Sequence, residues 1–253
     1  MHDTPNLEEQ AASKALEATI ASRVDAVEEI DVDIQTNLLK LILGQADTIE
    51  LAGKGMVMQK DIRLQEIEVN ANNVDIDTFS VFSGQIELDK PVDATAKIVI
   101  TESDINRALN SEYVLKKARN LKLDVDGKTV ILEMQQMNLN LPGNNKMLFT
   151  GKTLLHEKSE TQQVSFTATF RPRTQKQPVI VENFQCDREQ GIPFAISVAL
   201  MQKIKQWIEL PYFDLEGITI RVEEMVVQAG QLALQLQIRM KHLPQNLTVK
   251  NAN

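Results

Sequence analysis

The residue types that carry most enzyme chemistry are few in this chain of 253 residues, and they lie far apart in the sequence. The three histidines, His2, His156 and His242, have no partner at a spacing that would bind a metal. Cys186 is the single cysteine and has neither Cys nor His beside it, so zinc binding and thiol redox chemistry are not expected. The Gly-x-Ser-x-Gly motif of many hydrolases is absent. The sequence therefore predicts no metal, no cofactor and no enzyme activity.

Two further patterns superficially suggest phosphate or calcium binding. Gly127-Lys128-Thr129 and Gly151-Lys152-Thr153 match the end of a P-loop, but both lack its upstream glycine. We interpret both as hairpin or strand-entry signals. Three pairs of aspartates also occur two residues apart, and none continues into a calcium loop with a distal Glu: Asp31/Asp33, Asp75/Asp77 and Asp124/Asp126. We interpret these pairs as solvent-facing positions of strands or turns.

Composition narrows the class of protein. The chain has 27 Lys and Arg against 35 Asp and Glu, a net charge of −8, and only 4% aromatic residues. Such a chain offers neither the positive charge nor the stacking surfaces that nucleic acids require, so no nucleic-acid partner is expected. The first residues show no basic, apolar signal peptide, and the longest apolar run, Phe194–Met201, falls far short of the ~20 residues of a membrane span. We therefore expect a cytoplasmic protein whose membrane contact, if it has any, is peripheral.

The elements of the first part are predicted from periodicity. An Ala-, Glu- and Leu-rich stretch predicts a helix over Leu7–Val24, and alternation predicts a strand over Ile30–Gln35. A short helix over Leu38–Leu43 should end at Gly44. Successive strand signals between Ile49 and Ile76 favour an antiparallel meander, and a regular strand over Val92–Thr101 follows.

The second part begins with a capping box, Thr101 and Asp104, that predicts a helix to about Ala118. Asp126-Gly127 predicts a hairpin and Pro142–Asn145 a turn. A wide-faced apolar helix is predicted over Pro193–Ile208. The remaining strands are predicted at Leu121–Val125, Thr129–Leu141, Met147–His156, Val164–Phe170, Val179–Phe184, Leu215–Val227 and Leu232–Met240.

The strands Thr129–Leu141 and Leu215–Val227 change the parity of their apolar residues midway, which is typical of a bulge or a strong bend. We therefore predict an α+β fold with a long curved antiparallel sheet wrapped around helices, and either a core helix or a ligand could fill the curve. We expect one domain over residues 1–253. Similarity between Ile62–Asn70 and Ile220–Gln228 hints at two weak halves, 1–101 and 102–253.

Several segments of the chain resemble the LmeA-like phospholipid-binding family of cyanobacteria and actinobacteria. The resemblance is carried by the opening helix and by Val27–Val32, Leu38–Asp47, Ile49–Met58, Val92–Ala96, Thr101–Asn110 and Phe213–Gly217. It implies curved antiparallel strands around a helix, as in tubular lipid-binding modules, and phospholipid as the partner. Actinobacterial relatives are exported envelope proteins, whereas no export signal is seen here, so we expect lipid binding at the cytoplasmic face of a membrane or in relation to thylakoids.

From these observations we predict a non-enzymatic phospholipid-binding protein that acts as a carrier or peripheral membrane factor. Acyl chains would lie in an apolar groove between the curved sheet and the helices, where flexible methionines adapt to a mobile ligand. The candidate groove residues are Met56, Met58, Met134, Phe194, Val198, Met201, Ile204 and Trp207. The alternatives are that these residues simply fill the core, or that the protein is a scaffold whose sheet face pairs with a partner or a second copy. An enzyme that acts on lipid is the third hypothesis. The sequence does not determine the oligomeric state.

Overall fold

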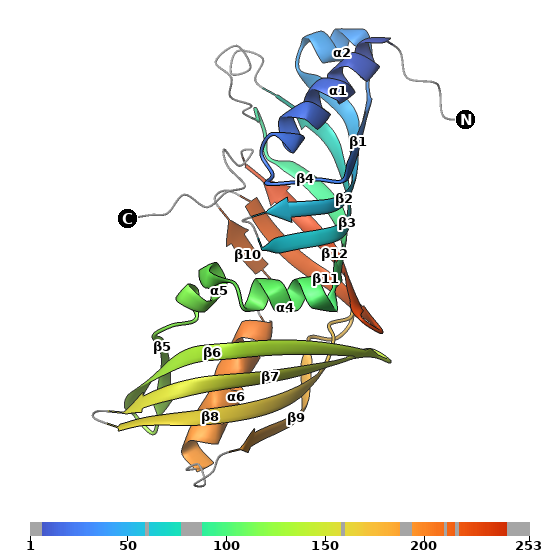
Figure 1. Ribbon diagram of the computed structural model, residues 1–253. Helices are drawn as coiled ribbons and strands as arrows, with labels where there is room; N and C mark the ends of the chain where they lie inside the picture. Colours follow the sequence, from blue (N-terminus) through green and yellow to red (C-terminus); the bar gives the residue numbers. More distant parts are fainter. Residues whose placement is uncertain are drawn as a thin grey trace. The chain divides into compact units, whose positions relative to one another are not determined.

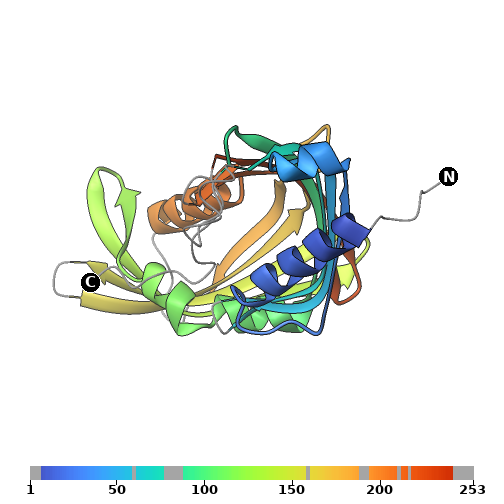
Figure 2. The same ribbon diagram turned by 90° about the horizontal axis from the view of Figure 1, so that it is seen from above.

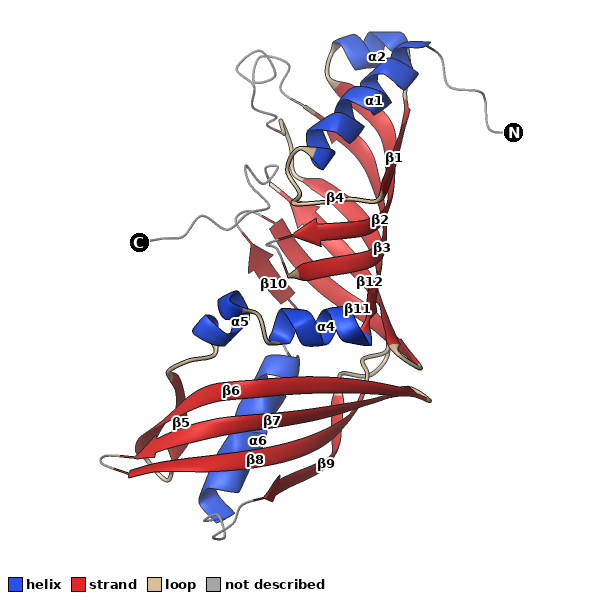
Figure 3. Cartoon of the chain, viewed as in Figure 1, coloured by secondary structure: helices blue, strands red, loops and turns tan. Residues whose placement is uncertain are grey.

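The chain folds into two compact units, which we describe separately (Figures 1 and 3). Unit 1 comprises residues 1–100, 211–223 and 233–253, and unit 2 comprises residues 101–210 and 224–232. The computed structural model describes residues 7–58, 61–76, 88–157, 160–187, 194–209, 212–215 and 218–241, with backbone only for residues 117, 157, 160, 187, 206–209 and 212–215. A functional role of the whole chain as one lipid-binding domain stays a prediction.

A seven-stranded sheet provides the framework of unit 1. Its order is β1 (Glu29–Gln35), β2 (Gln45–Met58), β3 (Ile62–Asp75), β4 (Val92–Thr101), β12 (Gln231–Met240), β11 (Ile218–Gln228) and β10 (Tyr212–Leu215). The short strand signals predicted between Ile49 and Ile76 merge into two long strands. β2 and β3 pair antiparallel from Gln45 opposite Asp75 to Met58 opposite Ile62, so the meander is simpler than predicted.

The helix α1 (Leu7–Ala21) covers one face of this sheet (Figure 2). Its residues Ala12, Leu16 and Ile20 recur every four positions and pack on buried side chains of β1 to β4. The buried members of this cluster are Val32, Ile34, Ala46, Ala71, Val74, Val92 and Ala94. The helix ends at Ala21, three residues before the predicted Val24.

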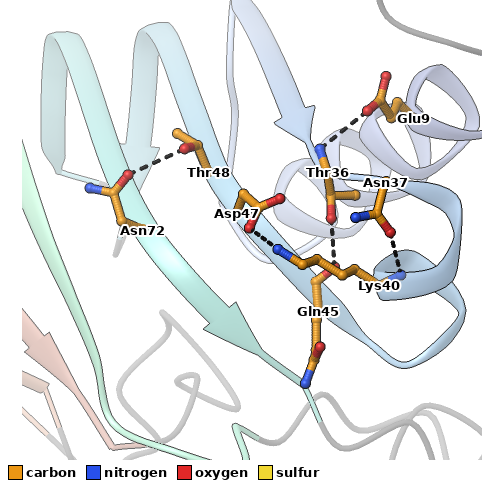
Figure 4. Close-up of polar contacts among 8 residues, drawn as sticks. All are labelled: Glu9, Thr36, Asn37, Lys40, Gln45, Asp47, Thr48 and Asn72. Carbon is orange, nitrogen blue, oxygen red and sulfur yellow. Dashed lines mark hydrogen bonds and ion pairs between the residues drawn. The ribbon is translucent and has the colours of Figure 1, made fainter.

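A second stripe of α1 satisfies the free edge of β1. Since β1 pairs on one side only, its outward N–H groups need other acceptors. The N–H groups of Val32, Ile34 and Thr36 donate to Glu17 Oε1 (3.2 Å), Ser13 Oγ (3.2 Å) and Glu9 Oε1 (3.1 Å); the last bond is drawn in Figure 4. Four helical residues rise ~6 Å, close to the ~6.8 Å of two strand residues, so the two series stay in step.

Unit 2 contains a curved five-stranded sheet and a helix, α6 (Phe194–Glu209), on its concave side (Figure 1). The strand order is β5 (Leu121–Val125), β6 (Lys128–Gly143), β7 (Lys146–Glu157), β8 (Glu160–Arg171) and β9 (Ile180–Asp187). The helix contacts both β5 and β9, the two edge strands. A sheet whose two edges touch one helix must curve around it, as the sequence predicted. The chain contains more strand and less helix than the predicted α+β class suggests.

The predicted helix after Thr101 is two helices, which corrects the sequence analysis. α4 (Glu102–Leu109) begins at the expected cap, where Thr101 Oγ1 accepts from the Asp104 N–H at 3.1 Å. It ends at Asn110, and α5 (Glu112–Lys117) starts anew with Ser111, whose Oγ accepts from the Val114 N–H. The break follows from Asn110, because its side chain hydrogen-bonds to the backbone of Met137 in β6 and thereby fixes the end of α4.

Side chains of α4 extend the sheet of unit 2 as a further strand would. Within the described part of the chain, β5 pairs with β6 only as far as Leu132, and beyond that point this side of β6 has no paired strand except an isolated bridge between Pro142 and Ala229. Asn106 accepts from the Leu139 N–H (2.7 Å) and donates to its carbonyl (2.8 Å), and Asn110 does the same at Met137 (3.1 and 2.6 Å). Glu102 accepts from the Leu141 N–H at 2.6 Å.

The turns and the bulge of β6 agree with the sequence. Asp126 and Gly127 both have positive φ, 51° and 78°, as a two-residue hairpin requires. The pairing of β6 with β7 shifts between Met134 and Gln136, where the apolar parity of the strand changes. The bulge lets Met134 and Met137, an odd number of positions apart, both turn inward and become buried.

Candidate functional site

The candidate site is an apolar groove in unit 2 between α6 and the edge strand β9. It has a volume of about 380 Å³ and is lined by Pro178, Val179, Ile180, Val181, Met201 and Lys205. This volume lies at the lower end of the range typical of small-molecule sites. Five of the six lining side chains are apolar, so the groove suits a hydrocarbon chain better than a polar metabolite.

The wall that α6 contributes belongs to a stripe on the helix surface. Phe194, Val198, Met201 and Lys205 follow each other at spacings of four, three and four residues, which places them on one face. On the far side of the helix Ile196, Ala199 and Leu200 are buried, and Ile204, which borders the stripe, is buried as well. The helix therefore anchors itself with one face and presents a second face that is only partly covered.

The length and ends of this stripe are informative. From Phe194 to Lys205 the helix rises about 16 Å, close to the ~15 Å depth of one leaflet of a bilayer's hydrocarbon core. Phe194, at one end, is 82% exposed, and Lys205, at the other, is one of the residues that line the groove. An apolar track with a cation at one end matches the chemistry of an acyl chain and its phosphate.

The predicted groove residues divide between the two units. Met56 and Met58 lie in β2 of unit 1, where Met56 is buried and its Cε lies 3.4 Å from a Cβ built at Gly53. Met134 lies in β6 of unit 2 and is also buried. Its Cε and the Phe166 ring cover Gly151, where an added Cβ would clash with Phe166 Cζ. Met56 and Met134 thus pack tightly against the backbone of their own sheets.

Of the α6 candidates, Met201 lines the groove. Phe194 and Val198 share the stripe of Met201, whereas Ile204 lies beside that stripe and is buried. The side chain of Trp207 lies outside the described part of the structure, as does Pro193, the predicted start of the helix. The ligand contacts of the predicted groove residues stay a prediction.

The wall supplied by Pro178–Val181 was not anticipated from the sequence. Alternation predicted the strand, but nothing local indicates which helix an edge strand will face. The usable signal was the pattern of α6 itself, which is apolar almost all round in its first half although one face suffices for packing.

A polar cluster on the sheet of unit 2 resembles a catalytic arrangement but lacks its surroundings. His156 Nδ1 lies 3.0 Å from Thr161 Oγ1, and His156 Nε2 lies 3.1 Å from Glu133 Oε2. Hydrogen bonding to His156 lowers the pKa of the Glu133 carboxyl below its usual value, and Arg119 adds to this effect. The three residues lie on adjacent strands β6, β7 and β8, and none of them lines the groove. We interpret the cluster as cross-strand pairing.

Within the described ranges, no group of three or more His, Cys, Asp or Glu residues could hold a metal ion. None of the described helices is both long and apolar enough to cross a membrane.

Comparison with known proteins identifies the family. The model of the LmeA-like phospholipid-binding family matches residues 4–237 and thus spans most of the chain. The chain belongs to the LmeA-like phospholipid-binding family. No curated protein and no solved structure is detectably similar to it. Membership in the LmeA-like family agrees with the resemblance seen in the sequence.

Proposed function

We propose that this protein binds a phospholipid without transforming it, and that an acyl chain occupies the groove between α6 and β9. Membership of the LmeA-like family supports phospholipid as the ligand class. The single observation that carries the location is the groove of about 380 Å³, whose walls are aliphatic except for Lys205. Every methylene that leaves water for such walls contributes about 0.8 kcal/mol.

The orientation of the lipid follows from charge. Lys205 is the cation among the lining residues, and an ammonium group is a suitable point-charge partner for phosphate. We therefore place the headgroup phosphate near Lys205 and the acyl chain along Met201, Val198 and Phe194. In this arrangement the chain terminus lies near Phe194, whose exposed ring would become covered by the ligand.

Catalysis is not part of the proposal because the groove offers no chemistry for it. Among its six lining residues, all within the described part of the chain, Lys205 is the one titratable side chain, and none has a hydroxyl, thiol or carboxyl group. A hydrolase or transferase needs a nucleophile and a base within hydrogen-bond reach of the reacting atoms. A carrier or a peripheral membrane factor needs only the apolar groove and the cation.

Native mass spectrometry of the purified full chain tests this function. We expect a mass increment equal to one phospholipid, and we expect a lipid extract of the same sample to contain phosphorus. Denatured protein from the same preparation should show the polypeptide mass alone, because the lipid is not covalently bound. A ligand-free dimer would contradict the proposal and favour a scaffold protein, and a ligand-free monomer after incubation with phospholipid micelles would also contradict it. Formation of lysophospholipid or free fatty acid during incubation would contradict the non-enzymatic part.

A further inference from the structure

The short helix α2 (Leu38–Ile42) and its cap residue Leu43 expose an unusual amount of aliphatic surface. We call Leu38, Leu39, Ile42 and Leu43 the apolar tip. Their exposed fractions are 47%, 76%, 66% and 63%, and they are four of the seven exposed large apolar side chains in the described part of the chain. Soluble proteins expose single apolar residues routinely, but a cluster in six consecutive positions marks a contact surface.

The polar groups around the apolar tip hold α2 in place (Figure 4). Asn37 Oδ1 caps the helix by accepting from the Lys40 N–H at 3.0 Å, and Thr36 Oγ1 donates to the Gln45 carbonyl at 3.2 Å. After the helix, the Gly44 carbonyl accepts from the Ile76 N–H at 2.8 Å. These bonds connect both ends of α2 to the sheet of unit 1 and thereby fix the position of the apolar tip.

We propose that the apolar tip inserts into the surface of a phospholipid bilayer and docks the protein there. This inference rests on the proposed function, because a protein that takes up or delivers phospholipid must meet the membrane that holds it. The tip consists of branched aliphatic side chains without aromatic or hydrogen-bonding groups. Such side chains gain free energy from any hydrocarbon environment and need no complementary shape.

The size of the apolar tip argues against a stable protein partner. A standard protein–protein interface buries about 800 Å² on each partner and involves some 20–30 residues a side. The tip comprises four side chains within six consecutive residues. A second copy of the chain or another protein would therefore need much additional surface, whereas insertion into a bilayer needs only the tip itself.

The charges beside the tip predict which bilayers it binds. Lys40 Nζ lies 2.5 Å from Asp47 Oδ1, so the positive charge within the segment is paired. Nearby, the carboxylate of Glu9 accepts from the Thr36 N–H. The described residues of this segment thus provide no excess positive charge, so docking should not require anionic lipid. Docking should also persist at high salt, because salt screens charge pairs but does not weaken the insertion of aliphatic side chains.

Flotation of the full-length protein with phosphatidylcholine vesicles tests the proposal. The double variant Leu39→Glu/Ile42→Glu should lower the apparent partition coefficient by about tenfold or more, because two inserted aliphatic side chains become charged. Ala15→Glu/Ala18→Glu is the matched control: it adds the same charge at two exposed positions of α1, another helix of unit 1. The control should bind vesicles like the wild type, and 0.5 M salt should leave wild-type binding within about twofold.

Four results would overturn the proposal: no binding of the wild type to vesicles, unchanged binding of Leu39→Glu/Ile42→Glu, an equal loss in the control variant, or conversion of a wild-type dimer to a monomer by the tip variant. The last result would show that the tip is an interface between copies. Native mass spectrometry separates this proposal from the proposed function. If the tip variant keeps its bound phospholipid but loses vesicle binding, docking and lipid binding are distinct, as proposed. If the wild type docks but carries no lipid, only the proposed function fails.

Discussion

At the scale of single residues, the charges of Lys205 and Glu17 have the clearest consequences, for the proposed ligand site and for stability respectively. Lys205 is the charged residue among the lining residues of a groove that is otherwise apolar. The carboxylate of Glu17 joins α1 to the free edge of β1 through the Val32 N–H. One residue belongs to the proposed ligand site and the other to the framework, so substitutions at each should affect different measurements.

At the ligand site, Lys205→Gln should weaken phospholipid binding about fivefold, because a partly exposed ammonium–phosphate contact contributes modestly. Displacement of a fluorescent phospholipid would measure the change in affinity. The control is Lys152→Gln on β7, an exposed lysine of the same unit outside the groove, which should bind like the wild type. Equal losses in both variants would mean that the effect is general electrostatics and not a contact at the groove.

In the framework, Glu17→Gln should flatten the dependence of stability on pH. The Lys14 ammonium, 2.7 Å away, holds the pKa of the Glu17 carboxyl below its usual value, and the Val32 N–H adds to this. A carboxyl with a lowered pKa in the folded state stabilises the fold above its unfolded pKa of about 4.5 and loses that contribution as pH falls. Urea unfolding at pH 6 and pH 3.5 measures this. If the variant and the wild type lose equal stability between the two pH values, the ion pair contributes nothing.

At the scale of elements, most helices and strands could be predicted because their signals are local. The alternation in Val92–Thr101 yields β4 with the predicted bounds, and Asp126-Gly127 yields the predicted hairpin. The break between α4 and α5 could not be predicted, because it depends on Asn110 bonding to Met137, 27 residues away. The merging of the short strand signals into the long strands β2 and β3 could not be predicted either, because each of these strands is continuous only through its pairing with the other.

The hydrogen bonds from side chains of α4 to the edge of β6 lead to a prediction about stability. Asn106→Ala removes both side-chain bonds to Leu139 and leaves a backbone N–H and carbonyl without these partners. It should lower the free energy of unfolding by about 1–3 kcal/mol, measured by equilibrium denaturation. Asn106→Asp keeps the side-chain acceptor but loses the donor, so its free energy of unfolding should lie between those of the wild type and Asn106→Ala.

The control for this prediction is Asn138→Ala, at an exposed position of the same strand β6, which should change stability by less than about 0.5 kcal/mol. If Asn106→Ala is as stable as this control, then water replaces the amide fully. The proposed contribution of α4 to the sheet edge would then be wrong.

At the scale of the whole molecule, the family and the class of fold could be predicted, whereas the groove could not. A curved sheet around a helix follows from bent strands and an apolar helix, both visible in the sequence. The groove arises where Pro178–Val181 and Met201 meet, and these segments are about 20 residues apart with no local signal that joins them. The methionines indicated the groove only in part. Met201 lines the groove, but Met56 and Met134 are buried against the backbone of their own sheets.

The most direct test of the central claim compares bound phospholipid in Met201→Asp and Gln202→Asp by native mass spectrometry. Met201 lines the groove, and its neighbour Gln202 on the same helix is exposed. A carboxylate in the groove would have to lose its hydration beside an acyl chain, so Met201→Asp should reduce lipid occupancy at least about fivefold while circular dichroism stays like that of the wild type. Gln202→Asp should retain full occupancy. Unchanged lipid in Met201→Asp, or unfolding of that variant alone, would contradict the claim that the groove between α6 and β9 holds the acyl chain.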